Sequence, residues 1–83
     1  MKRQNIRKEI VTQNEDFTIY KWYDDFGEEH NQIIYSKLQL MTSHDDRDKV
    51  IAYNEVEIEV VSGPFGSFTY RSFWKDGHLV FMD

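Results

Sequence analysis

The chain has 83 residues, enough for one domain with a modest core, and it lacks cysteine, which excludes disulfides and thiolate metal sites. Six Phe, five Tyr and two Trp must therefore supply much of the buried apolar surface. The formal charge is −5, but residues 1–8 hold four basic and no acidic groups, so residues 9–83, with six basic and fifteen acidic groups, carry −9. We expect a single domain over residues 1–83 with a basic N-terminal arm at residues 1–8.

The acidic body disfavours phosphate-rich ligands and anionic membrane surfaces, because like charges repel. The chain contains neither an apolar run typical of a signal peptide nor about 18 consecutive apolar residues. These features predict a soluble cytoplasmic protein that does not bind membranes and is a poor general binder of nucleic acid.

Two strands are predicted in the first third of the chain. The segments IRKEIVT and FTIYKWY are rich in β-branched and aromatic residues, which favour strands. The polar residues Gln13–Asp16 between them are typical of a turn.

Residues 28–42 allow two interpretations. Ile34, Leu38 and Leu40 have the same parity, as on one face of a strand, whereas Ile34, Leu38 and Met41 share a helical face. Because Leu40 falls off that helical stripe, we favour a strand, bounded by turns at Asp24–Asn31 and Ser43–Asp48.

A further strand is predicted from about Val50, with an acidic outer face. Val56, Ile58 and Val60 alternate with three glutamates, which is the period of a half-buried strand. Strict alternation would place Tyr53 beside those glutamates, so we expect a bulge or bend near Asn54.

The last two strands form a predicted hairpin. A turn at Ser62–Gly66 precedes it, and Asp76-Gly77 is the dipeptide that a type I′ turn prefers. In that register Trp74 faces Leu79 and Ser72 faces Phe81. Phe68 and Tyr70 continue the same side, and we expect Phe68, Tyr70, Trp74 and Phe81 to form core.

Together these elements predict an all-β fold, a small antiparallel meander of five or six strands that curls or closes into a small barrel. The alternative is an α+β fold with a helix near residues 28–42. Open strand edges would also permit a homo-oligomer.

No catalytic or cofactor motif is present. In a meander His44 and His78 lie at one end and His30 at the other, so three histidines cannot converge on a metal, and exposed turn histidines are expected. The acidic loops lack calcium-binding spacing, and no serine elbow or phosphate-binding loop occurs. We expect a protein that is not an enzyme and has neither cofactor nor metal.

The leading functional hypothesis is a protein-binding module that occupies a basic or mixed surface of a larger host protein, as an inhibitor and nucleic-acid mimic. In composition, though in no motif, the chain resembles the small inhibitors that phages make against host nucleic-acid enzymes and defence systems. The expected charge contacts are Glu55, Glu57, Glu59, Asp24, Asp25, Glu28 and Glu29. The expected aromatic anchors are Trp22, Tyr23, Phe26 and Phe73.

Two other functions stay open. The aromatic sheet could bind single-stranded nucleic acid or a nucleotide, with help from the basic residues Arg71, Lys75, Lys2, Arg3, Arg7 and Lys8. Alternatively, the chain is a structural subunit that assembles through its strand edges.

Overall fold

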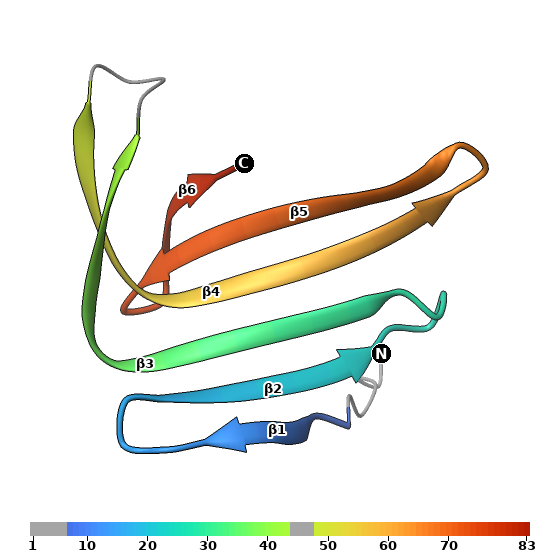
Figure 1. Ribbon diagram of the computed structural model, residues 1–83, viewed down its shortest axis with the longest axis horizontal. Coiled ribbons are helices and arrows are strands. Elements are labelled where there is room, and N and C mark those ends of the chain that lie inside the picture. The colour runs from blue at the N-terminus through green and yellow to red at the C-terminus, as the bar shows by residue number, and fades with distance from the viewer. Residues whose placement is uncertain (1–6, 44–47) are drawn as a thin grey trace, which may run out of the picture.

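The computed structural model describes residues 7–43 and 48–83, and their regular structure is entirely β-strand (Figure 1). The strands are β1 Glu9–Gln13, β2 Phe17–Tyr23, β3 Glu29–Ser43, β4 Lys49–Gly63, β5 Gly66–Lys75 and β6 His78–Met82. The all-β prediction is confirmed, and residues 28–42 form strand rather than helix. Within the described ranges, no helix is long and apolar enough to cross a membrane.

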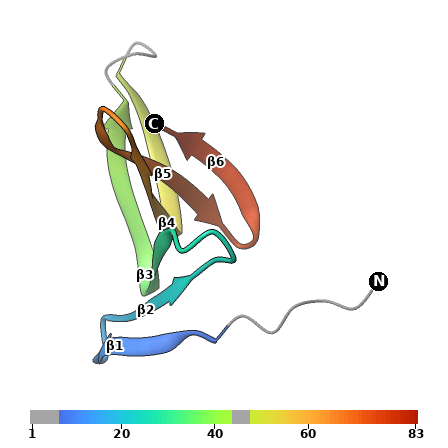
Figure 2. The same ribbon diagram turned by 90° about the vertical axis from the view of Figure 1, so that its right-hand side faces the viewer.

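The six strands form one antiparallel sheet in the order β1-β2-β3-β4-β5-β6, so each strand pairs with its neighbours in the chain. β1 and β6 are the two edges, and the sheet is an open, curled meander rather than a closed barrel. Figure 2 shows that strands at the two ends of the sheet run in clearly different directions, as the twist of antiparallel sheets requires.

Local turn chemistry explains two of the connections. Asn14 Oδ1 accepts hydrogen bonds from the backbone N–H groups of Asp16 and Phe17, at 2.8 and 3.0 Å, which closes the β1–β2 turn. Asp76 and Gly77 both have positive φ, 48° and 83°, as a type I′ turn needs. The predicted turns at these two positions are confirmed.

The longest strands, β3 and β4, bend sharply in mid-course. Their pairing shifts register between Ile34 and Gln39 of β3, opposite Asn54 of β4, so the predicted irregularity near Asn54 is confirmed. The bend carries Tyr53 away from the glutamates and sets its ring edge-on to Phe73, with ring centroids 5.0 Å apart.

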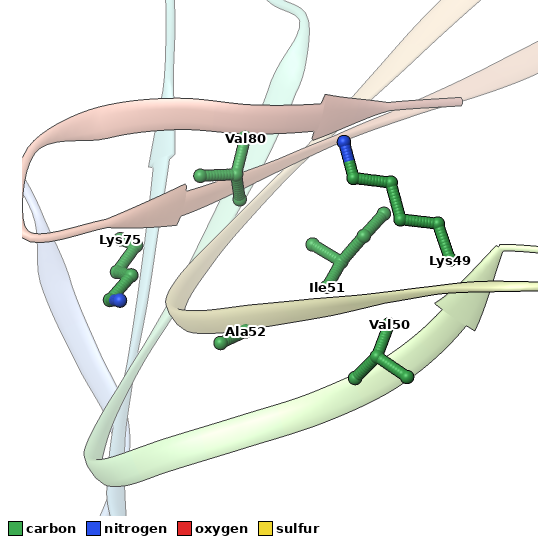
Figure 3. A pocket seen from close by; sticks show the side chains of 6 residues that line it. All are labelled: Lys49, Val50, Ile51, Ala52, Lys75 and Val80. Atoms are coloured by element: carbon green, nitrogen blue, oxygen red, sulfur yellow. The ribbon is translucent and has the colours of Figure 1, made fainter. Parts of the chain in front are cut away.

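Beyond the bend, residues 39–43 of β3 and 49–53 of β4 pair only with each other and form a two-stranded arm, which Figure 1 shows turning away from the sheet. A hollow of about 290 Å³ lies between the arm and the C-terminal hairpin. Its lining residues are Lys49, Val50, Ile51, Ala52, Lys75 and Val80. Ile51 and Val80 point toward one another there (Figure 3), so the arm lies against β6.

One face of the sheet, which we call the aromatic face, carries most of the core. Its central row consists of successive register partners in β2 to β6, namely Ile19, Ile33, Val56, Phe73 and Phe81. Beside it, ring contacts run through Phe17, Tyr35, Tyr53, Phe73 and Phe81. The buried core is narrow, since in residues 7–43 and 48–83 its hydrophobic members are Trp22, Ile51, Val56 and Phe73.

One predicted pairing in the last hairpin is wrong. Phe81 pairs with Phe73 and not with Ser72, because a register shift at Val80 offsets the two strands by one residue. The offset turns Phe81 onto the aromatic face, where its ring completes the row of contacts.

Candidate functional site

The face opposite the aromatic face, which we call the acidic face, carries three glutamates in its middle. Glu55, Glu57 and Glu59 take alternate positions of β4 and therefore project to one side. Their register partners on the two neighbouring strands are Ile34, Gln32 and His30 of β3 and Trp74, Ser72 and Tyr70 of β5. These neighbours leave the glutamates half-buried, so the row is partly covered rather than fully solvated.

His30 is held on the acidic face by three neighbours. Its Nε2 lies 3.0 Å from Asp24 Oδ2, and its Nδ1 lies 3.6 Å from Glu57 Oε1, which is beyond hydrogen-bond distance. The imidazole stacks on the indole of Trp22, with ring centroids 5.2 Å apart and planes at 8°. The side chain is 12% exposed, so the prediction of an exposed turn histidine is wrong. The predicted turn extended to Asn31, but β3 begins at Glu29 and therefore brings His30 into the sheet.

Asp24 follows β2 directly, and the next turn fixes its carboxylate. Its Oδ1 accepts hydrogen bonds from the backbone N–H groups of Phe26 and Glu28, both at 2.9 Å, which leaves Oδ2 to face His30. The hydrogen bond with His30, followed by that from the Glu28 N–H, lowers the pKa of Asp24 below its ordinary value of 3.8. Asp24 is therefore a carboxylate at neutral pH.

A polar chain ties the end of the basic arm to the glutamate row. Lys8 Nζ donates to Gln32 Oε1 at 3.0 Å, and Gln32 Nε2 donates to Glu55 Oε2 at 2.9 Å. The same ammonium lies 4.7 Å from the centroid of the Trp22 ring. Lys8 thus contributes to the acidic face instead of extending away from it. Lys2 and Arg3 of the predicted arm lie outside the described residues.

The fold also gathers three metal-ligating groups that are separate in the sequence. One ligand atom each from Asp24, His30 and Glu59 lie within 4.8 Å of one another. This group was not expected from the sequence, because His30 was assigned to an exposed turn at the end of the meander away from His78; His44 lies outside the described residues. The signal was the β3–β4 register, which sets His30 opposite Glu59.

The predicted partner-binding residues are divided by the structure. Five belong to the acidic face or face it, namely Glu55, Glu57, Glu59, Asp24 and Trp22. Three lie in the β2–β3 turn, namely Asp25, Phe26 and Glu28. The remaining three belong to the opposite, aromatic face, namely Tyr23, Glu29 and Phe73.

Two of the four expected aromatic anchors are not on the surface. Trp22 is 8% exposed, because His30 and Lys8 cover its ring, and Phe73 is 5% exposed in the middle of the aromatic face. The expected surface position of both side chains is wrong. Tyr23 and Phe26 are exposed, as expected.

Two aromatic residues that were expected in the core are exposed at the surface instead. Phe68 and Tyr70 were expected in the core, but they are 57% and 48% exposed and lie on the acidic face, opposite Val61 and Glu59. Alternation along the hairpin placed Phe68 and Tyr70 on the same predicted core face as Trp74, whereas the core lies on the other face of β5.

Next to Tyr70 the acidic face is hollowed. The hollow measures about 280 Å³ and is lined by Glu57, Glu59, Val61, Tyr70, Ser72 and Met82. It combines two carboxylates with an aromatic ring and two apolar side chains. Such a lining suits a long cationic side chain, whose aliphatic stem packs on the apolar wall while its charged head meets the carboxylates.

Comparisons with protein-family models, curated proteins and solved structures found no match to this chain.

Proposed function

We propose that this chain is a non-enzymatic protein-binding module that occupies a basic surface of a larger protein and thereby inhibits or modulates it. The observation that carries the proposal is the hollow in which Glu57 and Glu59 adjoin the exposed ring of Tyr70. A lysine or arginine side chain of the partner would fill it, with its charge at the carboxylates and its stem on Val61 and Met82.

The wider surface supports the same kind of partner. The glutamates of the row stand about 6.5–7 Å apart along β4, and the net charge of −9 over residues 9–83 would steer a basic partner toward it. Phe68 and Tyr70 supply exposed aromatic area beside the row, and buried aromatic anchors provide much of the binding energy in protein interfaces.

Direct nucleic-acid binding has less support, because two of the cations named for it are engaged. Arg71 forms a two-point ion pair with Asp83. Lys8 donates to Gln32 beside the acidic row. A phosphate approaching that face would meet carboxylates first.

The test is a pull-down with tagged protein from host lysate, with and without nuclease treatment, read by mass spectrometry. The triple variant Glu55→Gln, Glu57→Gln, Glu59→Gln removes the row of charge and retains similar side-chain shapes. We expect the wild type to capture a partner with a basic surface and the triple variant to lose it. Purified partner and chain should then bind more weakly as salt rises.

The matched control is Glu9→Gln, Glu15→Gln, Asp16→Asn, which removes the same charge from exposed positions in β1 and its turn. It should capture the partner as the wild type does. Equal loss in both triple variants would mean that net charge alone drives capture, and capture that requires intact nucleic acid would contradict the proposal.

Self-association is a second candidate, favoured by the open sheet. β1 pairs only with β2, and its Ile10 and Val11 are exposed. An unpaired edge with apolar side chains can pair with another copy. Light scattering over a concentration series should then show dimers, and replacing Val11 with lysine should abolish them. A mass that stays monomeric at all concentrations would exclude this function.

A further inference from the structure

The group formed by Asp24, His30 and Glu59 has dimensions close to those of a metal site. Asp24 Oδ2 and His30 Nε2 are 3.0 Å apart, and the three ligand atoms all lie within 4.8 Å. Two ligands bound to one tetrahedral Zn²⁺ at about 2.0–2.1 Å stand about 3.3 Å apart. Asp24 and His30 therefore already have a suitable separation, and the flexible side chain of Glu59 needs to move by at most about 1.5 Å.

The surroundings support each ligand as they do in metal sites. A ligating histidine commonly offers its second nitrogen to a carboxylate, and His30 Nδ1 lies 3.6 Å from Glu57 Oε1 with no hydrogen-bond partner of its own. Asp24 is fixed through its other oxygen by two backbone N–H groups. The ring of Trp22 holds the imidazole plane by stacking.

The chemical nature of the three ligands indicates which class of metal ion the site would prefer. One imidazole nitrogen with two carboxylate oxygens suits Zn²⁺ and related transition metals, whereas Ca²⁺ and Mg²⁺ take oxygen ligands almost entirely. The three residues are half-buried, so water can complete the coordination.

We propose that Asp24 Oδ2, His30 Nε2 and a Glu59 carboxylate oxygen bind one divalent transition-metal ion, for which Zn²⁺ is the best-fitting example. Glu57 then accepts a hydrogen bond from His30 Nδ1 and orients the ring. Glu57 and Glu59 also line the hollow proposed for the partner, but metal binding at this site does not require that partner.

The test is isothermal titration calorimetry of the full, chelator-treated chain with zinc chloride, and with magnesium chloride in parallel. Zn²⁺ should bind saturably at one ion per chain, and Mg²⁺ should not bind. Because Trp22 stacks on His30, tryptophan fluorescence should change over the same titration and return when chelator is added.

Variants of three glutamates on β4 distinguish coordination of Zn²⁺ by a specific side chain from a general attraction of the ion to negative charge. Glu59→Gln should weaken Zn²⁺ binding at least tenfold, and Glu57→Gln about 10–100-fold, as loss of an outer partner does. Glu55→Gln removes the same charge from the same face of β4 and should leave the affinity unchanged. Equal weakening by Glu55→Gln and Glu59→Gln, or the lack of saturable binding by the wild type, would overturn the proposal.

Thermal unfolding followed by circular dichroism shows whether each variant folds. Should Glu59→Gln unfold, Asp24→Asn takes its place, because asparagine can still accept the two backbone hydrogen bonds that shape the turn. A chain that binds Zn²⁺ but captures no basic partner would refute the proposed function alone, and the reverse result would refute this site alone.

Discussion

The two faces of this sheet are stabilised in different ways. On the aromatic face, rings and aliphatic side chains pack across β2 to β6 around Val56 and Phe73. On the acidic face, Trp22 and Gln32 are also buried, but they are covered by His30 and Lys8 through stacking and hydrogen bonds. The comparison indicates that one face maintains the fold, whereas the other orders charged groups that a ligand can use.

The largest expected effect is a difference in folding stability between alanine variants of two aromatic residues in β5. Phe73→Ala removes a buried ring and should destabilise the chain by about 3–5 kcal/mol. Tyr70→Ala, on the acidic face, removes a ring that is about half exposed and should cost under about 1 kcal/mol. Urea unfolding of both variants measures the difference, and equal costs would break the distinction between the faces.

A smaller effect is expected from the polar chain of the acidic face. Gln32→Ala removes the partner of both Lys8 and Glu55 and should cost about 1–3 kcal/mol, because part-buried polar groups lose their hydrogen bonds. Gln13→Ala on β1 is the control, since that residue is exposed. The same unfolding assay applies, and equal stability of the two variants would show that the polar chain does not stabilise this face.

The contact between Lys8 and Trp22 should contribute less to the stability of the fold than the hydrogen bonds of Gln32 do. Lys8→Met should lower stability by about 0.5–1 kcal/mol, the range for an exposed cation over an aromatic ring, and shift the Trp22 emission. Arg7→Met makes the same change in charge one residue earlier and should alter neither. Thermal melts with fluorescence detection distinguish them, and identical behaviour would indicate that net charge is responsible.

The smallest effect at neutral pH concerns Tyr53, near the bend. Burial, and then the neighbouring Tyr35, raises the pKa of Tyr53 above its ordinary value of 10.0. The folded chain therefore favours the neutral phenol, and this stabilisation is complete below pH 10 and is lost as pH rises through the raised pKa. Tyr53→Phe should match the wild type at pH 7 and lose less stability above pH 10.

Melting temperatures between pH 7 and pH 11 measure this difference. The control is Tyr70→Phe, which removes the hydroxyl of an exposed tyrosine elsewhere on the sheet. Parallel curves for Tyr53→Phe and the wild type would show that the phenol of Tyr53 does not titrate with unfolding.

Much of the fold follows from local signals in the sequence. The alternation of Val56, Ile58 and Val60 with glutamates, and the turn at Asp76-Gly77, depend on chemistry within a few residues. The bend near Asn54 was also predictable, because strict alternation would have placed Tyr53 among charges. The register at Val80 was not, since one inserted residue reverses which face each side chain occupies and leaves no local mark.

The candidate site was predictable only in part. The glutamate row is visible as alternation, but its neighbours come from β2, β3 and β5, and pairing between strands determines them. His30 was assigned to a turn because the start of β3 has no strong boundary signal. Trp22 was assigned to the surface because its neighbours in sequence are polar, whereas its neighbours in space cover it.

By itself, the sequence determined an acidic, all-β chain and several of its turns, because periodicity, turn residues and charge are local properties. Only the tertiary structure decided which face became core, which aromatic residues stayed exposed, and that Asp24, His30 and Glu59 meet. The physical reason is that these outcomes depend on strand register and on the bend in β3 and β4. The alternation of residues predicted the bend near Asn54, but the register is set by packing between distant segments, which no short stretch of sequence records.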